Sequence, residues 1–264
     1  MQIDFHDGKS VELEFNEAKH QYSHDGEFGP AVTSVLSTTI AKQQFLMPWA
    51  VKMGAEWFKE NCLGYDSFHD NDEAIEEVVK GIKGAYKRKS AGAIDLGRRV
   101  HEWCEQAILW KLGKAEVPSM PEEEPAVNAI NAFRDWVKSN EVEWLAAEQR
   151  VYSRKHNYAG TVDAVAHVNG EFSVIDFKTS TRIYEEYYLQ VAAYSKCVED
   201  IYGDPVDKAY ILRFDKQSGK FDAEMSSNIE VDFFTFCGLL VGYRVLTKLR
   251  SRGKGLTTIG LWLG

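Results

Sequence analysis

Two aspartates and a lysine are spaced so that a β-hairpin would bring their side chains together. Asn169-Gly170 lies between two runs rich in apolar, β-branched residues, and Asn-Gly in that setting is a strong signal for a two-residue hairpin turn. Counting outward from such a turn places Asp163 opposite Asp176. Lys178 follows Asp176 by two residues and therefore shares its face. The sequence predicts two carboxylates and one ammonium group on a single face of this hairpin.

Two carboxylates held this close need a neighbouring positive charge. Directly opposed side chains have Cβ atoms about 5 Å apart, and like charges at that range disfavour joint ionisation. Carboxylate oxygens are preferred ligands of hard divalent cations such as Mg²⁺ or Mn²⁺. The opposite face of the hairpin is apolar and is expected to be buried: Val162, Ala164, Ile175 and Phe177.

The alternative is that these charges face solvent on an edge hairpin. The triplet Asp/Glu-x-Lys occurs three times in the chain, beginning at Asp7, Glu17 and Asp176, so the triplet alone does not discriminate. Only the third follows a β-branched strand and has an upstream acid in register, which favours the functional interpretation.

Three flanking features are candidates to join the hairpin. Gln190 and Tyr194 are four residues apart on the next expected helix and therefore share a face. His101 lies beside an apolar helical stripe, where a structural role is the more common alternative. Glu148 precedes the hairpin on a strand-like segment, where the alternative is a surface charge.

Hydrophobic periodicity indicates the elements that must position these residues. The second half is expected to form strands at 142–153, 158–168 and 171–178, a helix at 185–202, a hairpin at 206–226 with Ser218-Gly219 near its turn, and a helix at 230–250. The first half is expected to begin with a β-hairpin region at 1–28, followed by a helix that is capped by Thr33 or Ser34 and ends at Ile40. A second helix is expected after Pro48, and a solvated acidic segment at 66–77. A long helix from Ile94 to Leu112 should follow, and then a helix with an apolar stripe at Ala126, Ile130, Phe133 and Val137.

The composition is that of an ordinary globular protein, which excludes a disordered or collagen-like chain. The 264 residues contain 44% hydrophobic residues, without a run long enough for a transmembrane helix. The N-terminus lacks the features of a secretory signal. Four cysteines lie far apart without a CxxC pair, so we expect neither a disulfide framework nor a zinc site. A cytoplasmic location without membrane association is expected.

The net charge of −9 argues mildly against a nucleic-acid binder. However, residues 1–150 hold 17 basic and 26 acidic residues, whereas residues 151–264 hold 14 of each. The acidic excess therefore lies away from the hairpin. Binding of a phosphate backbone requires local rather than global positive charge.

Several ordered motifs resemble the RecB-like branch of the PD-(D/E)xK nuclease superfamily, in particular the mitochondrial genome-maintenance exonucleases and their phage and bacterial relatives. The similarity covers roughly residues 30 to 200. It is carried by Pro30-Ala31-Val32-Thr33-Ser34, Leu96-Gly97-Arg98-Arg99-Val100-His101-Glu102, Tyr158-x-Gly160-x-x-Asp163, Ile175-Asp176-x-Lys178-Thr179-Ser180 and Leu189-Gln190-x-x-x-Tyr194. Ala31 departs from the serine of the family pattern.

The resemblance implies an α/β (α+β) fold with a central mixed β-sheet of the restriction-endonuclease-like type, flanked by helices. It further implies one nuclease domain over 1–264, made of an N-terminal β-hairpin region at 1–29, a helical wrapping region at 30–140, a nuclease core at 141–250 and a C-terminal tail at 251–264.

The resemblance also implies a metal site. Asp163, Asp176 and His101 would be ligands of Mg²⁺ or Mn²⁺, with the backbone carbonyl of Phe177 as a further ligand. Iron–sulfur members of this branch use a late cluster of three cysteines, which this chain lacks. No iron–sulfur cluster is therefore expected.

Four further residues receive catalytic roles from the same comparison. Lys178 would orient or activate the attacking water and stabilise the charge that develops on the phosphate. Glu148 would be an outer ligand or a water-positioning acid. Gln190 and Tyr194 would position Lys178 or the DNA backbone.

Residues near these motifs are candidates for DNA contact. The first group is Thr33, Ser34, Arg98, Arg99, Arg154, Lys155, Thr179, Ser180 and Arg182. The second group comprises Arg213 and the acid-free run Arg244, Lys248, Arg250, Arg252 and Lys254, for which helix-dipole complementation is the alternative. The third group, Tyr184, Tyr187 and Tyr188, could stack on unpaired bases or pack against the core.

The leading hypothesis is a metal-dependent DNA exonuclease acting on single strands or DNA ends in phage or bacterial recombination, repair or replication. A single-strand annealing or replication protein is a candidate partner. One alternative is a structure-specific or restriction-type endonuclease of the same superfamily. The other is a DNA-binding module without catalysis.

Overall fold

A five-stranded mixed sheet forms the centre of the protein. The computed structural model describes residues 1–16, 21–24, 26–41, 43–62, 72–214 and 221–252. The sheet has the order β10-β9-β8-β7-β6, with β6 (Val142–Ser153), β7 (Tyr158–Val168), β8 (Glu171–Lys178), β9 (Lys208–Phe214) and β10 (Phe221–Met225). Only β8 and β9 pair in parallel, because α5 (Glu185–Tyr202) carries the chain back across the sheet between them. The predicted α/β class with a central mixed sheet is confirmed.

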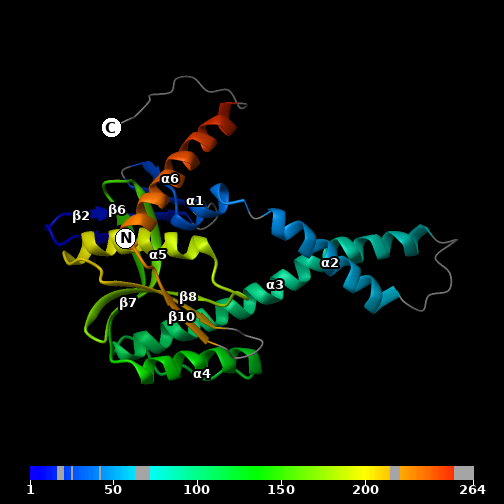
Figure 1. Ribbon diagram of the computed structural model, residues 1–264, viewed down its shortest axis with the longest axis horizontal. Helices are drawn as coiled ribbons and strands as arrows, with labels where there is room; N and C mark the ends of the chain where they lie inside the picture. Colours follow the sequence, from blue (N-terminus) through cyan, green and yellow to red (C-terminus); the bar gives the residue numbers. More distant parts are fainter. Residues whose placement is uncertain (17–20, 25, 42, 63–71, 215–220, 253–264) are drawn as a thin grey trace.

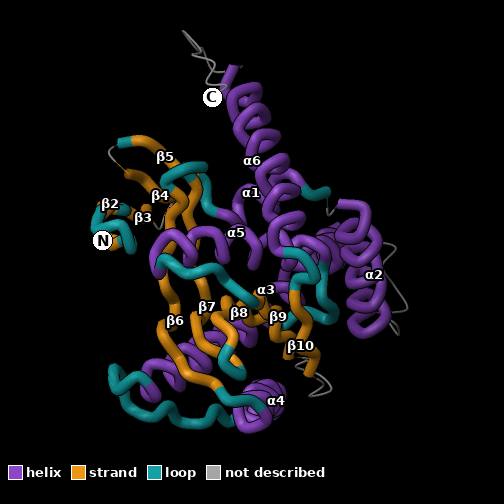
Figure 2. Tube along the Cα trace, turned by 60° about the vertical axis from the view of Figure 1, so that its left-hand side comes forward, coloured by secondary structure: helices purple, strands orange, loops and turns teal. Residues whose placement is uncertain are grey.

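Helices cover both faces of this sheet (Figure 2). On one face, α3 (Asp72–Lys111) and α4 (Glu124–Ser139) bury a core around Phe133, Phe177 and Phe214. On the other face, α1 (Val32–Thr39), α5 and α6 (Ile229–Arg252) bury a core around Tyr158 and Phe236. Strands β7 and β8 are therefore covered on both sides and are held rigidly.

The β7–β8 hairpin has the register that the sequence predicts. Asn169 and Gly170 have φ values of 53° and 81°, as a two-residue turn of type I′ requires. Backbone pairing extends from Val168 opposite Glu171 to Ala164 opposite Ile175. Asp163 and Asp176 follow directly beyond the last backbone pair, where the Asp163 carboxylate accepts the N–H of Phe177.

The predicted apolar face of the hairpin is fully buried. Val162, Ala164 and Ile175 have no exposed surface and Phe177 is 1% exposed. Val162 nevertheless packs in the core beneath α5, whereas the other three pack beneath α3 and α4. The expectation that all four share one face is therefore wrong for Val162.

Helix α2 (Gln43–Cys62) and the first half of α3 form an arm that projects from the sheet (Figure 1). The prediction that the long helix begins near Ile94 is wrong, because α3 begins at Asp72. This first half packs on α2, where Ile82 lies against Gly54 and Tyr86 against Trp49. Gly81 lies against Trp57, where an added Cβ would be 2.0 Å from the indole ring. Pro48 lies inside α2 rather than before it.

The N-terminal strands and α1 differ from expectation in detail. The predicted hairpin region forms two small antiparallel sheets, one of β1 (Gln2–Asp4) and β2 (Ser10–Glu12), the other of β3 (Glu14–Asn16), β4 (Gln21–His24) and β5 (Glu27–Gly29). Neither Thr33 nor Ser34 caps α1, because Ala31 occupies the N-cap and bridges to Ala159 on β7.

The remaining predicted helices and the β9–β10 hairpin are present. The expected turn at Ser218-Gly219, the acidic segment at 66–71 and the tail beyond Arg252, including Lys254, lie outside the described residues. None of the described helices is long and apolar enough to cross a membrane.

Candidate active site

The predicted site residues meet in an open pocket of about 540 Å³. Helices α3 and α5, strands β6 to β8 and the N-terminal strands contribute to its wall. The lining side chains that bear on chemistry are His101, Glu105, Glu148, Arg150, Asp163, Asp176, Lys178, Gln190 and Tyr194.

Asp163 takes over a backbone hydrogen bond where the β7–β8 pairing stops. Its Oδ2 accepts the N–H of Phe177 at 2.6 Å, so the carboxylate is fixed on the neighbouring strand. Burial raises the pKa of Asp163, and the positive charge of Lys178 opposes that shift.

Asp176 is 1% exposed and is held from two sides. Its Oδ1 accepts the Nε2 amide of Gln190 at 2.9 Å, and its carboxylate forms an ion pair with Lys178. Oδ2 is buried and has no hydrogen-bond partner of good geometry among the described residues. Burial raises the pKa of Asp176 to about 6, despite the opposing effect of Lys178.

Lys178 remains an ammonium group in this site. Burial lowers its pKa, but the negative charges of Asp176 and Asp163 outweigh that effect and raise the pKa overall. Its Nζ also lies 4.9 Å from the centre of the Tyr187 ring, close enough for a cation–π contact. One predicted stacking tyrosine therefore contacts the lysine.

Gln190 and Tyr194 orient the carboxylate of Asp176. The Nε2 of Gln190 is also 3.2 Å from the Tyr194 hydroxyl, so one amide contacts both groups. Tyr194 lies so close to Gly160 that a Cβ added there would be 2.4 Å from its ring. Gln190 thus bonds to Asp176, the ion-pair partner of Lys178, and Tyr194 bonds to Gln190.

His101 reaches the site from α3. Its Nδ1 lies 3.6 Å from Asp163 Oδ2, and the Phe177 backbone is a hydrogen-bond partner of the ring. Burial, together with the charge of Lys178, lowers the pKa of His101 to about 4. The imidazole is therefore neutral near pH 7, as a metal ligand must be.

Glu148 stands opposite Asp163 in a strained part of β6. Its neighbours pair with β7 as Ala147–Ala164 and Gln149–Val162, which places Glu148 across from Asp163. Its φ of 46° is uncommon outside glycine and such strain often marks functional positions. Burial and the nearby acids raise the pKa of Glu148 to about 8.

Several residues that line the pocket were not among the predicted site residues, and two of them, Glu105 and Tyr22, make informative contacts. Glu105 lies one turn after His101 on α3 and lines the pocket; burial and the charge of Glu102 raise its pKa. Its four-residue spacing from His101 is a usable signal. Tyr22 donates or accepts a hydrogen bond with Thr161 at 3.1 Å, across a separation in sequence that no local pattern reveals.

The residues predicted to contact DNA are dispersed. Thr33 lines the pocket. Three arginines are paired with acids: Arg98 with Asp95 and Glu102, Arg99 with Asp95 and Glu123, and Arg154 with Asp7. The others lie outside the pocket: Ser34, Lys155, Thr179, Ser180 and Arg182. Their contact with DNA stays a prediction.

Two further basic residues have structural partners. Arg213 is 5% exposed, pairs with Asp222 and donates to two backbone carbonyls. Arg244 donates to the carbonyls of His156 and Asn157. Tyr188 bonds through its hydroxyl to Glu224. These contacts give the three residues partners within the protein, and their contact with DNA stays a prediction.

Replacing Glu148 by glutamine should stabilise the protein at high pH. The pKa of Glu148 lies above its ordinary value, so the folded protein loses stability as the pH rises toward about 8. Partial exposure screens the repulsion, so the gain at pH about 9 should be modest, about 1 kcal/mol or 2 to 4 °C in Tm. Thermal denaturation should show no gain at pH about 5, where the wild-type carboxyl is protonated. A lower Tm at both pH values would contradict the assignment.

Comparison with known proteins finds distant structural neighbours. No family model and no curated protein matches the sequence. A candidate exonuclease from Eubacterium rectale is 9% identical and aligns over 64% of this chain and 77% of that chain, with a TM-score of 0.39. The alkaline exonuclease LHK-Exo from Laribacter hongkongensis is 11% identical over 57% of this chain and 84% of that chain, with a TM-score of 0.27. In complex with dAMP, LHK-Exo aligns with a TM-score of 0.31. The chain is similar to these proteins at a distance that assigns neither family nor activity.

Proposed function

We propose that the protein is a Mg²⁺- or Mn²⁺-dependent exonuclease that hydrolyses phosphodiester bonds in single-stranded DNA or at DNA ends. The observation that carries this proposal is the meeting of Asp163, Asp176 and Lys178 in an open pocket, beside a neutral His101 and the strained Glu148. A role in phage or bacterial recombination, repair or replication, beside a single-strand annealing or replication protein, rests on the sequence resemblance.

The donor set fits a hard divalent cation. Asp163, Asp176, His101 and the Phe177 carbonyl would hold it, since carboxylate and carbonyl oxygens are the ligands that such a cation prefers. Among the described residues no three acidic, histidine or cysteine side chains are already grouped as ligands. Asp176 is held by Lys178 and Gln190, so cation binding in this proposal requires that Lys178 releases Asp176. A bound cation would supply positive charge that favours ionisation of water and offsets the charge of the phosphate.

Three side chains of the protein have separate roles in the proposed reaction. Lys178, once released from Asp176, is an ammonium donor that can orient water and stabilise charge on the phosphate oxygens. Glu148, with a pKa of about 8, can accept or donate a proton near neutral pH. Gln190 keeps the carboxylate of Asp176 in place throughout.

A basic stripe on the arm supports a nucleic-acid substrate. Residues 78–94 of α3 contain five basic residues and no acid, and Lys80, Lys83 and Lys87 are exposed. Lys83 precedes His101 by 18 residues, about five helical turns, so both point to the same side of α3. A strand following this side of the arm would be led to the pocket, about 27 Å away.

Nuclease assays test the proposed reaction and its alternatives. We expect the protein to release mononucleotides from end-labelled linear DNA with Mg²⁺ or Mn²⁺, but not with EDTA. Asp176→Asn or Lys178→Met should lower the rate by about 10²-fold or more, since each removes a charged group from the centre. Glu171→Gln, an exposed acid on the same hairpin, is the matched control. Cutting of circular single strands would indicate an endonuclease, and retarded but intact DNA would indicate a binding module.

Charge reversal on the arm should weaken DNA binding without affecting the chemical step. For Lys83→Glu/Lys87→Glu we expect weaker binding, with the slope of log K against log salt reduced by about 2. Lys114→Glu, beyond the end of α3, is the control. Equilibrium binding to a fluorescent single strand at several salt concentrations measures both quantities. Unchanged affinity and slope would exclude the arm from the DNA path.

A further inference from the structure

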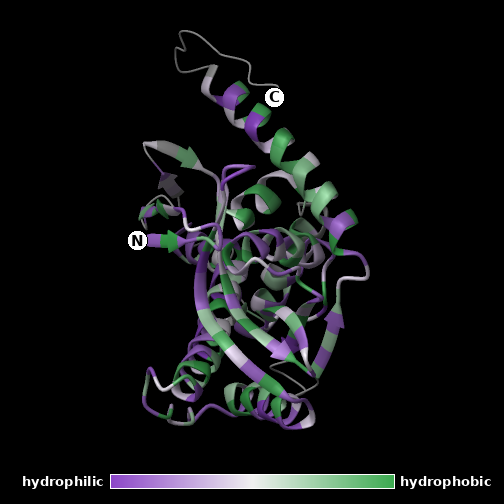
Figure 3. Ribbon diagram, turned by 90° about the vertical axis from the view of Figure 1, so that its left-hand side faces the viewer, coloured by the Kyte–Doolittle hydropathy of each residue, from purple (hydrophilic) through white to green (hydrophobic). Residues whose placement is uncertain are grey.

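Helix α6 is apolar on two opposite faces, and within the part of the chain that the structure describes only one of these faces is covered. Phe236 and Leu240 are buried against α1 and α5. The opposite side carries an outer stripe of exposed residues, which we define as Val231, Phe234, Val241, Val245 and Leu249, with exposed fractions of 57, 79, 56, 51 and 48%. Figure 3 shows hydrophobic colouring along much of α6, which stands clear of the sheet at its C-terminal end. A helix that is apolar all round is normally buried.

The spacing of the outer stripe is that of a helix-pairing seam. Together with Gly238, its members follow one another by alternating steps of three and four residues from Val231 to Val245. This repeat aligns apolar side chains along one line of a helix and is typical of two helices that pack together. The seam therefore fits another helix better than a flat surface.

Two glycines at the middle of the helix add to this pattern. A Cβ at Gly238 or Gly242 would meet nothing within 4 Å, so packing within the chain does not require glycine there. Each glycine costs a helix about 1 kcal/mol relative to alanine. Small residues allow two helix axes to approach closely, since the axial separation depends on the side chains at the contact.

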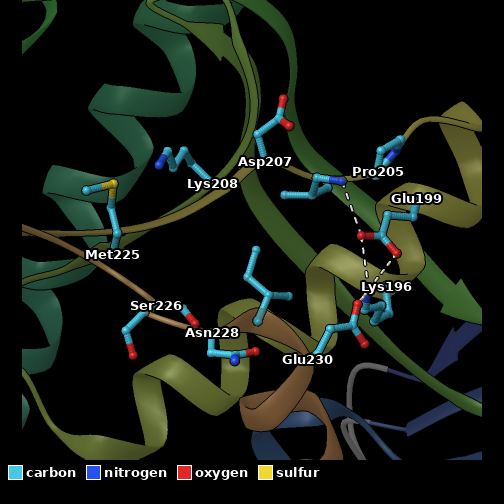
Figure 4. Close-up of a pocket in the computed structure, with 12 residues that line it drawn as sticks. Lys196, Glu199, Pro205, Asp207, Lys208, Met225, Ser226, Asn228 and Glu230 are labelled. Atoms are coloured by element: carbon cyan, nitrogen blue, oxygen red, sulfur yellow. Dashed lines mark hydrogen bonds and ion pairs between the residues drawn. The ribbon is translucent and has the colours of Figure 1, made fainter.

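Charge along α6 favours an antiparallel partner. Glu230 and Asp232 lie in the first turn, and Lys248 and Arg250 lie near the C-terminal end, where they are exposed. Figure 4 shows Glu230 at the rim of a pocket beside Lys196, with which it forms an ion pair. A second α6 in the antiparallel direction would bring acidic ends against basic ends. A parallel arrangement would bring like charges together.

We propose that the outer stripe of α6 binds the same stripe of a second copy of this chain, with the two helices antiparallel about a two-fold axis near Gly238 and Gly242. In that arrangement Glu230 approaches Lys248, which lies on the same flank of the stripe, and Phe234 approaches Val245. The same surface patch then serves both subunits, as a two-fold interface requires.

The size of the stripe sets the strength of the association. From Val231 to Leu249 it is about 27 Å long, and one helix face of this length buries less than the roughly 800 Å² per partner of a typical stable interface. We therefore expect a reversible dimer with Kd in the range of about 1 to 100 μM.

Sedimentation equilibrium of the full chain tests the interface. Over about 1 to 200 μM we expect a monomer–dimer equilibrium that Val241→Glu/Val245→Glu shifts to monomer, with Tm and nuclease activity unchanged. Val51→Glu on α2, where the valine is 73% exposed, is the matched control and should leave the dimer intact. A monomer at every concentration would overturn the proposal, as would equal effects of the two variants. A monomer whose Tm falls in Val241→Glu/Val245→Glu would show that the stripe is covered within one chain.

A second variant tests the orientation of the helices. Lys248→Gln/Arg250→Gln removes attraction from an antiparallel pair and should raise the dimer Kd about 3- to 10-fold at low salt. In a parallel pair the same substitutions remove repulsion, so tighter association would overturn the antiparallel arrangement.

Discussion

The ion pair between Lys178 and Asp176, enclosed by the central sheet, is the interaction on which the site depends. Burial alone would drive protons onto Asp163 and Asp176, because a charged carboxylate loses its hydration there. The positive charge of Lys178 lowers the pKa of both acids and so opposes their protonation. Its own burial is compensated by the same two charges, so each member of the trio depends on the others.

That balance is incomplete, which is the physical reason for proposing a cation at this site. The pocket is lined by four acids, Glu105, Glu148, Asp163 and Asp176, and their mutual repulsion contributes to the raised pKa values of Glu148, Asp163 and Asp176. Arg150 and Lys178 are the cations of the same wall. A divalent cation would restore neutrality and hold several carboxylates ionised, as two-carboxylate sites for phosphate chemistry require.

Local patterns predicted the elements that carry this site. Strands β6 to β8 and helix α5 have the predicted bounds, because alternation with period two and an Asn-Gly turn define register without reference to distant residues. The first half of α3 was missed although Ile75, Val79 and Ile82 have helical spacing, because the acids around them favoured a solvated segment. Tyr22 and the ion pair of Arg154 with Asp7 were missed for a different reason, since both join residues more than 130 positions apart. The pairing of Gln190 with Asp176 likewise depends on how α5 crosses the sheet.

Calorimetric titration with Mn²⁺ at pH 7, in two buffers of different ionisation enthalpy, tests the central claim most directly. If the acids form a cation site, the wild-type protein should bind Mn²⁺ and release protons, because Glu148, with a pKa of about 8, is largely protonated at pH 7 and must ionise. Asp176→Asn should abolish or strongly weaken binding. Absence of Mn²⁺ binding to the wild type, or equal binding by Asp176→Asn, would contradict the account.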